Sequence, residues 1–165
     1  MSKILIVDDE PGIRRILRKT LEDEGYTVFE AADGRECITQ QRKHRPKLVI
    51  IDILMPIKDG FETIKELKKE FPETIIFAMS GATYEGSTEK LLEVGRKLGA
   101  RRTFQKPLDM EEILNAVKEW LDKPMKAEDV ESKAISVKQT IPVWLWIIFI
   151  FIALILGFIL GNLGD

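Results

Sequence analysis

The sequence is poor in cysteine and histidine. Its 165 residues include one cysteine, Cys37, and one histidine, His44. A single cysteine cannot form an internal disulfide, which fits a reducing compartment. We expect Cys37 to be a small helix residue without a redox role. His44 lies in a charged run before Pro46, where we expect a solvated loop position. Neither residue is a leading candidate for the chemistry of this chain.

An excess of basic charge is also missing. Lys and Arg number 25 against 27 Asp and Glu, which gives a formal net charge of −2. Nucleic-acid-binding domains usually show a basic excess, so we expect no nucleic-acid partner. The N-terminus runs directly into a strand-like segment at Lys3, without the pattern of a signal peptide. We therefore expect the N-terminal part of the chain to lie in the cytoplasm.

Strand-like and helix-like segments alternate up to Leu121. Short apolar runs predict strands at residues 3–7, 26–29, 47–51, 74–79 and 102–105. Apolar residues at helical spacing predict helices at residues 11–24, 33–43, 60–71, 87–98 and 109–121. Five strands, each followed by a helix, predict an α/β fold with a doubly wound, five-stranded parallel sheet. The expected domain covers residues 1–122.

Charged residues directly follow three of the predicted strands. Asp8 and Asp9 follow the first strand, Asp52 the third and Lys106 the fifth. Open α/β sheets place their sites at the carboxyl ends of parallel strands, so we expect these side chains to share one pocket. Three carboxylates repel one another unless a divalent cation lies among them. The combination with a lysine predicts Mg²⁺-assisted handling of a phosphoryl group.

Four short motifs extend this pattern, each at the end of a predicted strand. They are Val7-Asp8-Asp9-Glu10, Asp52-Ile53-Leu54-Met55-Pro56-Ile57-Lys58-Asp59-Gly60, Ser80-Gly81 and Lys106-Pro107. In this order they resemble the receiver domain of two-component response regulators, over roughly residues 1–122. The resemblance implies a flavodoxin-like domain that accepts a phosphoryl group from a histidine kinase or a phosphotransfer protein.

The resemblance also implies a metal site. Asp9 and Asp52 would ligate Mg²⁺ directly, and the backbone carbonyl oxygen of Leu54 would be a third ligand. Asp8 would act mostly through water. Mg²⁺ prefers oxygen ligands and keeps several waters, which suits two carboxylates and one carbonyl.

The phosphoryl group would be held by three side chains. The resemblance implies that Asp52 is the phosphoacceptor nucleophile, that Ser80 donates a hydrogen bond to a phosphoryl oxygen and that Lys106 pairs with another. It also suggests a cis peptide bond before Pro107. Positioning and charge neutralisation are what phosphoryl transfer needs most, and a metal and a lysine supply both.

One position departs from the family pattern. The family usually has an aromatic residue three positions before the lysine, where this chain has Thr103. The aromatic residue is Phe104, which points to the opposite face of the strand. We expect Phe104 to be a core residue and the phosphorylation chemistry to survive the change. The aromatic side chain by which the family usually reports phosphorylation to its partners, on the last strand, is therefore replaced by Thr103 here.

A basic cluster lies on the first predicted helix and consists of Arg14, Arg15, Arg18 and Lys19. Two interpretations are open. Such a cluster is commonly a solvated face, but the resemblance places the docking of a kinase or phosphotransfer partner near this helix.

The C-terminal part has a different composition. Residues 123–140 are polar and of mixed charge, and they lack periodicity, which predicts a linker. Residues 141–163 contain no charged residue. As a helix they would span about 35 Å at ~1.5 Å per residue, enough for a hydrocarbon core of roughly 30 Å. We expect a single-pass transmembrane helix that anchors the chain in the cell membrane.

Charges flanking the predicted transmembrane helix indicate its orientation. Lysines precede it and only Asp165 follows it, which places the receiver domain on the cytoplasmic side. The lysines are Lys123, Lys126, Lys133 and Lys138. Gly157 and Gly161 form a small-xxx-small pattern that lets helices pack closely in lipid, so a homodimer is a further option.

The leading hypothesis is a membrane-tethered single-domain response regulator that signals through protein–protein interaction. One alternative is a pseudo-receiver, a scaffold that never cycles a phosphoryl group, which Thr103 mildly favours. Another is an aspartate-nucleophile phosphatase. Such enzymes typically have a second acid two residues past the nucleophile, where this chain has Leu54. We therefore expect a phosphoacceptor signalling module and not an enzyme.

Overall fold

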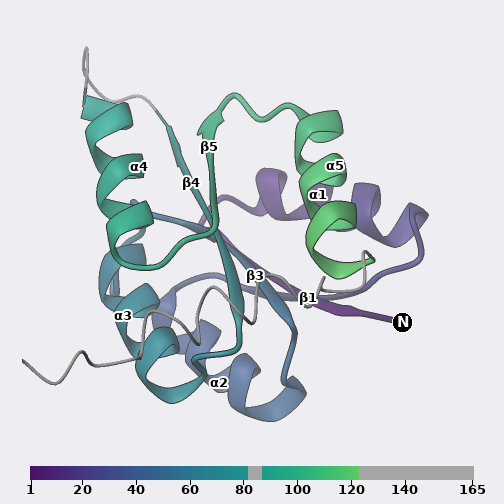
Figure 1. Cartoon of the computed structure of the whole chain (residues 1–165), viewed down its shortest axis with the longest axis horizontal. Coiled ribbons are helices and arrows are strands. Elements are labelled where there is room, and N and C mark those ends of the chain that lie inside the picture. The colour runs from purple at the N-terminus through teal and green to yellow at the C-terminus, as the bar shows by residue number, and fades with distance from the viewer. Residues whose placement is uncertain (82–86, 123–165) are drawn as a thin grey trace, which may run out of the picture. The chain divides into compact units, whose positions relative to one another are not determined.

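A computed structural model of the chain describes residues 1–81 and 87–122. Strands and helices alternate throughout this part (Figure 1). They are β1 (Lys3–Val7), α1 (Pro11–Asp23), β2 (Thr27–Ala31), α2 (Gly34–His44), β3 (Leu48–Asp52), α3 (Gly60–Glu70), β4 (Ile75–Gly81), α4 (Ser87–Lys97), β5 (Arg102–Lys106) and α5 (Met110–Leu121). All pairings are parallel, in the order β2-β1-β3-β4-β5. The predicted five-stranded parallel α/β fold is confirmed.

Helices cover both faces of the sheet. Figure 1 shows α1 and α5 together on one side, and α2, α3 and α4 on the other. Successive side chains of a strand point to opposite faces. Leu5 and Val7 accordingly belong to the core under α2, α3 and α4, whereas Ile4 and Ile6 belong to the core under α1 and α5. A strand buried on both faces needs a continuous apolar run, as β1 and β3 have.

Aspartates begin three of the helices. The carboxylate of Asp33 accepts hydrogen bonds from two backbone N–H groups at the start of α2. Asp109 caps α5 in the same way, and Asp59 caps α3 by accepting from one backbone N–H group, that of Glu62. Such caps satisfy backbone donors that have no partner within the helix. They fix where each helix leaves the carboxyl edge of the sheet.

Two local predictions differ from the structure. β4 extends to Gly81, so Ser80 lies within the strand and not in the loop after it. His44 is the last residue of α2, and its ring stacks on Phe29 of β2 at a centroid distance of 3.9 Å. The predicted solvated loop position of His44 was wrong, because α2 continues to this residue and its ring finds an aromatic partner. Burial lowers the pKa of His44, and the nearby charges of Lys43 and Lys3 lower it further.

The predicted linker at 123–140 and the predicted transmembrane helix at 141–163 lie outside the described residues. Among residues 1–81 and 87–122, no helix combines the length and the apolar character that a membrane span requires.

Candidate functional site

The candidate site lies at the carboxyl edge of the sheet, where four neighbouring strands end. Asp8 directly follows β1, Asp52 ends β3, Ser80 is the last residue but one of β4, and Lys106 ends β5. The order β1-β3-β4-β5 places these strands side by side. The parallel topology therefore gathers residues that are up to 98 positions apart.

The ammonium group of Lys106 is the centre of the site. Its Nζ atom lies 2.6 Å from Oδ2 of Asp52 and 2.8 Å from Oδ2 of Asp8. A third carboxylate, that of Glu10, lies 3.2 Å away. Asp8 and Asp52 are buried, whereas Glu10 is exposed. One cation therefore faces three carboxylates, two of which have little access to water.

Burial controls the electrostatics of Asp8. It raises the pKa of this carboxyl group more than the hydrogen bonds from Lys106 and from the backbone N–H of Glu10 lower it. Burial alone would lower the pKa of Lys106. The hydrogen bonds and charges of Asp52 and Asp8 outweigh burial, and the pKa of Lys106 is raised. The lysine is therefore charged at every physiological pH, and the carboxylates still exceed it in charge.

The surplus of carboxylates fits a divalent cation. One oxygen each from Asp8, Glu10 and Asp52 lie within 4.8 Å of one another. An all-oxygen donor set with one exposed side suits Mg²⁺, which binds carboxylates and keeps several waters. Asp8, Asp52 and Glu10 are the residues that would hold it, and the ion would supply charge neutralisation for a phosphoryl group.

The three clustered carboxylates, Asp8, Glu10 and Asp52, which we call the acidic group, differ in part from the predicted metal ligands. Asp8 and Asp52 lie together as expected, but Asp9 is exposed and outside this group of described carboxylates. Glu10 was not assigned a role from the sequence. Its position two residues after Asp8, at the start of α1, was the available signal. The backbone N–H of Leu54 donates to Oδ1 of Asp52 over 3.1 Å and orients that carboxylate.

Ser80 is fully buried beside the acidic group. In the register of β4 and β5, Ser80 pairs with Gln105, and Gly81 pairs with Lys106. The hydroxyl group of Ser80 makes a long contact of 3.5 Å to the carbonyl oxygen of Gly81. The hydroxyl group of Ser80 can therefore give up this weak hydrogen bond and donate a stronger one to an acceptor bound in the site.

The aromatic residue of β5 is part of the core. Phe104 is buried and packs against Phe77 at a centroid distance of 5.6 Å. Thr103, its neighbour, is half-buried and pairs with Ala78 of β4. The prediction that Phe104 is a core residue is confirmed. The peptide bond between Lys106 and Pro107 is cis, as the resemblance suggested.

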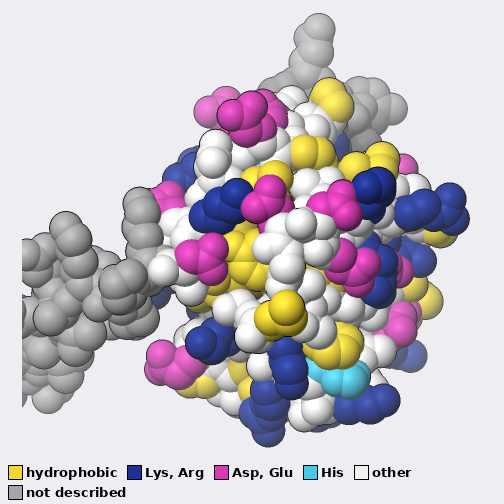
Figure 2. All heavy atoms as spheres, turned by 90° about the vertical axis from the view of Figure 1, so that its right-hand side faces the viewer, with side chains coloured by type: hydrophobic (Ala, Val, Ile, Leu, Met, Phe, Trp, Pro, Cys, Tyr) yellow, Lys and Arg dark blue, Asp and Glu magenta, His cyan; other side chains and the backbone are white. Residues whose placement is uncertain are grey.

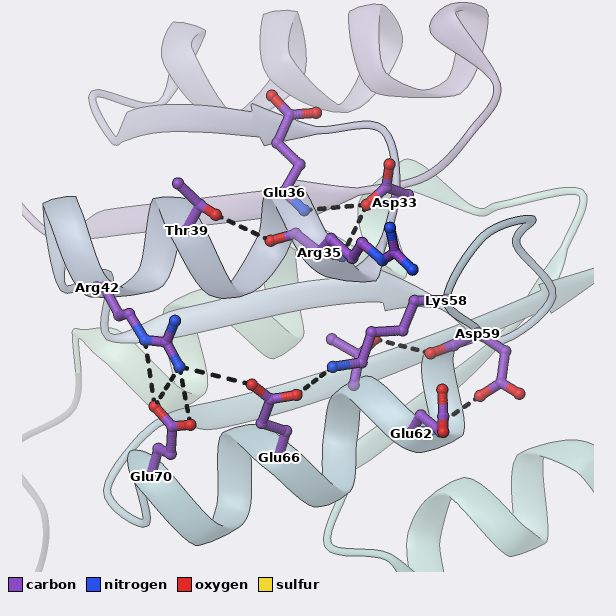
Figure 3. A network of polar contacts seen from close by, with 11 residues as sticks. Asp33, Arg35, Glu36, Thr39, Arg42, Lys58, Asp59, Glu62, Glu66 and Glu70 are labelled. Carbon is purple, nitrogen blue, oxygen red and sulfur yellow. Dashed lines mark hydrogen bonds and ion pairs between the residues drawn. The ribbon is translucent and has the colours of Figure 1, made fainter.

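Ion pairs connect α2, α3 and the loop between β3 and α3 (Figure 3). Lys58 of this loop pairs with Glu66 of α3, and Arg42 of α2 lies 3.6 Å from the same glutamate. Arg42 also pairs with Glu70 over 2.9 Å. The backbone N–H of Gly34 donates to the carbonyl oxygen of Lys58 over 3.3 Å. The loop that follows Asp52 is therefore tied to two helices.

Ile57 has an unusual conformation in this loop. Its φ angle is +70°, and its side chain is 70% exposed. A β-branched residue strains the backbone in this region, which favours glycine. Leu54 is also exposed, at 42%. Two apolar side chains therefore project from the loop that follows Asp52, a feature that the sequence pattern did not indicate.

The basic cluster on α1 is largely engaged within the domain. Arg14 donates to the carbonyl oxygen of Asp8 over 2.6 Å and pairs with Glu30. Arg18 pairs with the same glutamate, and Lys19 pairs with Asp23 on its own helix. Arg14 thus supports the backbone at Asp8, a contribution that neither interpretation of the cluster included.

Known proteins resemble the chain in sequence. The family model described as the response regulator receiver domain matches residues 4–118. Sporulation initiation phosphotransferase F of Bacillus subtilis (strain 168) is 39% identical over 126 residues, which cover 76% of this chain and 97% of that protein. Response regulator GtcR of Aneurinibacillus migulanus is 38% identical over 141 residues. The match covers 85% of this chain but only 56% of GtcR, so the chain spans about half of that relative.

Solved structures agree with the sequence matches. The chemotaxis response regulator CheY4 of Vibrio cholerae matches with a TM-score of 0.64 and 33% identity, over 72% of this chain and 98% of that one. A CheY-like receiver domain protein from Methanospirillum hungatei JF-1 has a TM-score of 0.67 and 28% identity, over 74% and 94% of the two chains. With its acidic pocket and its parallel sheet, the chain belongs to the response regulator receiver domain family and is a phosphoacceptor signalling module.

Proposed function

We propose that Asp52 accepts a phosphoryl group from the phosphohistidine of a histidine kinase or phosphotransfer protein. The observation that carries the proposal is the placement of Lys106 Nζ, 2.6 Å from Asp52 and 2.8 Å from Asp8 in a mostly buried pocket. The Bacillus relative that the chain covers over 97% of its length is named a phosphotransferase, which supports exchange of phosphoryl groups with other proteins.

In the proposed reaction, an Asp52 carboxylate oxygen attacks the phosphorus atom of the donor. A P–O bond forms, the P–N bond to the donor imidazole breaks, and the imidazole leaves with its electron pair and takes up a proton. Lys106 then pairs with one phosphoryl oxygen, and the hydroxyl group of Ser80 donates to another. Bound Mg²⁺ would neutralise phosphoryl charge. Asp8, Glu10 and Asp52 lie close enough together to hold it, and the resemblance adds Asp9 and the carbonyl oxygen of Leu54 as ligands.

Mass spectrometry of the intact protein tests the phosphoacceptor. The full chain is incubated with acetyl phosphate and Mg²⁺, beside Asp52→Asn and Asp59→Asn. Asp59 caps α3 outside the acidic group, so its variant controls for a nearby change of charge. We expect one phosphoryl group on the wild type and on Asp59→Asn, and none on Asp52→Asn. An unphosphorylated wild type that still binds Mg²⁺ would instead favour the non-cycling scaffold.

We further propose that the domain is tethered to the membrane and faces the cytoplasm. The support is the sequence: residues 141–163 lack charge, and lysines precede them. The phosphorylated domain would then signal by a changed affinity for another protein at the membrane. Deleting residues 143–165 and fractionating cells tests the tether. A truncated chain that still sediments with membranes would contradict it.

A further inference from the structure

Basic side chains gather at the amino edge of the sheet, opposite the acidic site. They are Lys3, Lys43, Arg45 and Lys47, which we call the basic edge. All four are exposed. Figure 2 shows dark blue side chains around the cyan His44 on this side of the molecule. Lys3 is distant in sequence from the other three, but β1, the end of α2 and the start of β3 meet here, because parallel strands all begin at one edge.

Most of this charge is not neutralised within the domain. Lys43 and Lys47 form no ion pair with any residue in 1–81 or 87–122. Arg45 lies over the ring of Phe71, with its guanidinium carbon 4.8 Å from the ring centroid. Lys3 donates to the carbonyl oxygen of His44 over 3.1 Å. None of these contacts cancels a positive charge.

Two of the four carboxylates that line cavities with the basic edge, Glu24 and Glu70, are already paired with other cations. Lys3, Arg45 and Lys47 line a cavity of about 600 Å³, together with Glu24 and Asp122. Glu24 pairs with Lys118 over 2.6 Å. The carboxylate of Asp122 accepts a hydrogen bond from the hydroxyl group of Tyr26 over 2.6 Å. Among the described residues, Asp122 and the exposed Glu73 have no cationic partner. The four positive charges of the basic edge outnumber these two carboxylates, so an excess of positive charge faces an external anion.

The chain leaves the domain at the same edge. Asp122 is the C-cap of α5 and the last described residue, and it lines the cavity of the basic edge. The predicted linker at 123–140 thus begins here, before the predicted transmembrane helix. If the predicted linker is a coil, its root-mean-square end-to-end distance would be roughly 25 Å for 18 residues. A tether that starts at the basic edge would favour approach of this edge to the bilayer over approach of the acidic edge.

We propose that the basic edge binds the anionic lipid headgroups of the membrane to which residues 141–163 anchor the chain. This inference rests on the tether proposed above. Exposed lysine and arginine side chains held next to an anionic leaflet are attracted within about one Debye length of its surface. The domain would then lie on the membrane in a fixed orientation, with its amino edge toward the lipid.

Lysine reactivity of the full chain tests this orientation. The protein is incorporated into nanodiscs of phosphatidylcholine, or of phosphatidylcholine with phosphatidylglycerol, and treated with an uncharged amine-acetylating reagent. Peptide mass spectrometry then compares Lys43 and Lys47 with Lys65 and Lys90, which are exposed on α3 and α4. In anionic discs we expect acetylation of Lys43 and Lys47 to be at least about threefold slower than in neutral discs, and about 0.5 M NaCl to remove the difference.

Matched charge reversals complete the test. The double variant Lys3→Glu/Arg45→Glu should abolish the protection of Lys43 and Lys47 in anionic discs. Arg35→Glu/Lys65→Glu makes the same change of net charge at exposed positions of α2 and α3. This control variant should retain the protection of Lys43 and Lys47. Thermal melting of both variants reports whether the fold is intact, and Lys3→Gln/Arg45→Gln replaces the first pair if it unfolds.

The remaining outcomes separate the two proposals. Equal acetylation in neutral and anionic discs, with the chain incorporated in both, overturns lipid binding and leaves the tether standing. If Lys43 and Lys47 react more slowly than Lys65 and Lys90 in both kinds of disc, protein covers the basic edge, and this result also overturns lipid binding. A chain that fails to enter neutral discs overturns the tether and this inference together.

Discussion

The side chain of Lys106 reaches 2.6 Å from Asp52, although 54 positions of the sequence separate the two residues. The same ammonium group lies 2.8 Å from the buried carboxylate of Asp8. Lys106 therefore supplies one positive charge to a group of carboxylates. A divalent metal ion bound to the same carboxylates would share them with the lysine.

Competition between the lysine and the metal gives the first prediction. Lys106→Met should strengthen Mg²⁺ binding by at least about tenfold. Unit charges roughly 4 Å apart interact by up to about 4 kcal/mol at an effective dielectric constant near 20, and about 1.4 kcal/mol already corresponds to a factor of ten. Isothermal titration calorimetry on the full chain measures the affinity. Lys65→Met, on the exposed face of α3, is the control and should bind as the wild type does. Weaker Mg²⁺ binding by Lys106→Met would show that the lysine supports the metal site.

A second prediction concerns pH and the carboxylate of Glu30. Burial would raise the pKa of Glu30, but hydrogen bonds and charge from Arg18 and Arg14 outweigh it and lower the pKa. A carboxyl group with a lowered folded-state pKa stabilises the fold above its unfolded-state pKa. This contribution is lost as the pH falls through the folded-state value.

Glu30→Gln should therefore reduce the free energy of unfolding by about 1 kcal/mol at neutral pH, since the side chain is 29% exposed. The difference from the wild type should shrink below about pH 4. Urea denaturation at both pH values measures it. Glu73→Gln, an exposed position in the turn between α3 and β4, should show no loss at either pH. A loss for Glu30→Gln that stays constant with pH would argue for packing instead of charge.

The third prediction concerns the close approach of α2 to the loop after β3. A Cβ atom at Gly34 would collide with the hydroxyl group of Thr63 and lie 2.9 Å from the carbonyl oxygen of Lys58. Gly34→Ala should reduce the free energy of unfolding by roughly 2–3 kcal/mol, because overpacking forces neighbouring groups to shift. Differential scanning calorimetry compares it with Gly12→Ala, where nothing lies within 4 Å.

Two results would support this account of Gly34. Gly12→Ala should be neutral or slightly stabilising, because alanine is the better helix former. Adding Thr63→Ala to Gly34→Ala should recover part of the loss, because one of the two obstacles is removed. Gly34→Ala with wild-type stability would mean that the loop moves aside freely.

The strained backbone at Ile57 gives the fourth prediction. Its φ of +70° is a conformation that asparagine tolerates better than a β-branched residue. Ile57→Asn should therefore raise the free energy of unfolding by about 1 kcal/mol, since the exposed side chain loses little burial. Ile57→Val keeps the branch at Cβ and should have no effect. Chemical denaturation distinguishes the two, and a destabilised Ile57→Asn would show that the isoleucine side chain contributes packing that outweighs its strain.

The sheet could be predicted well because its signals are local. β1, β3 and β4 contain short apolar runs, and Asp8, Asp52 and Lys106 mark the ends of β1, β3 and β5. Parallel topology then brings those ends together without any knowledge of side-chain packing. The acidic pocket around Lys106 follows from the same reasoning, and so does the burial of Phe104.

Features that depend on contacts between distant segments could not be predicted. The stacking of His44 on Phe29 requires the packing of α2 against β2. The engagement of Arg14 and Arg18 with Glu30 requires α1 to lie beside the same strand. The conformation of Ile57 follows from a loop tied to two helices. The transmembrane helix at 141–163 stays a prediction.

The acidic site and the basic edge lie at opposite ends of the same strands. Lys3 begins β1 and Asp8 follows it, and Lys47 precedes β3, which ends at Asp52. If the domain rests on a membrane by its basic edge, Asp52 faces away from the lipid. Diffusing donor proteins would then have unobstructed access to Asp52, and the domain could be phosphorylated and dephosphorylated while it stays at the membrane.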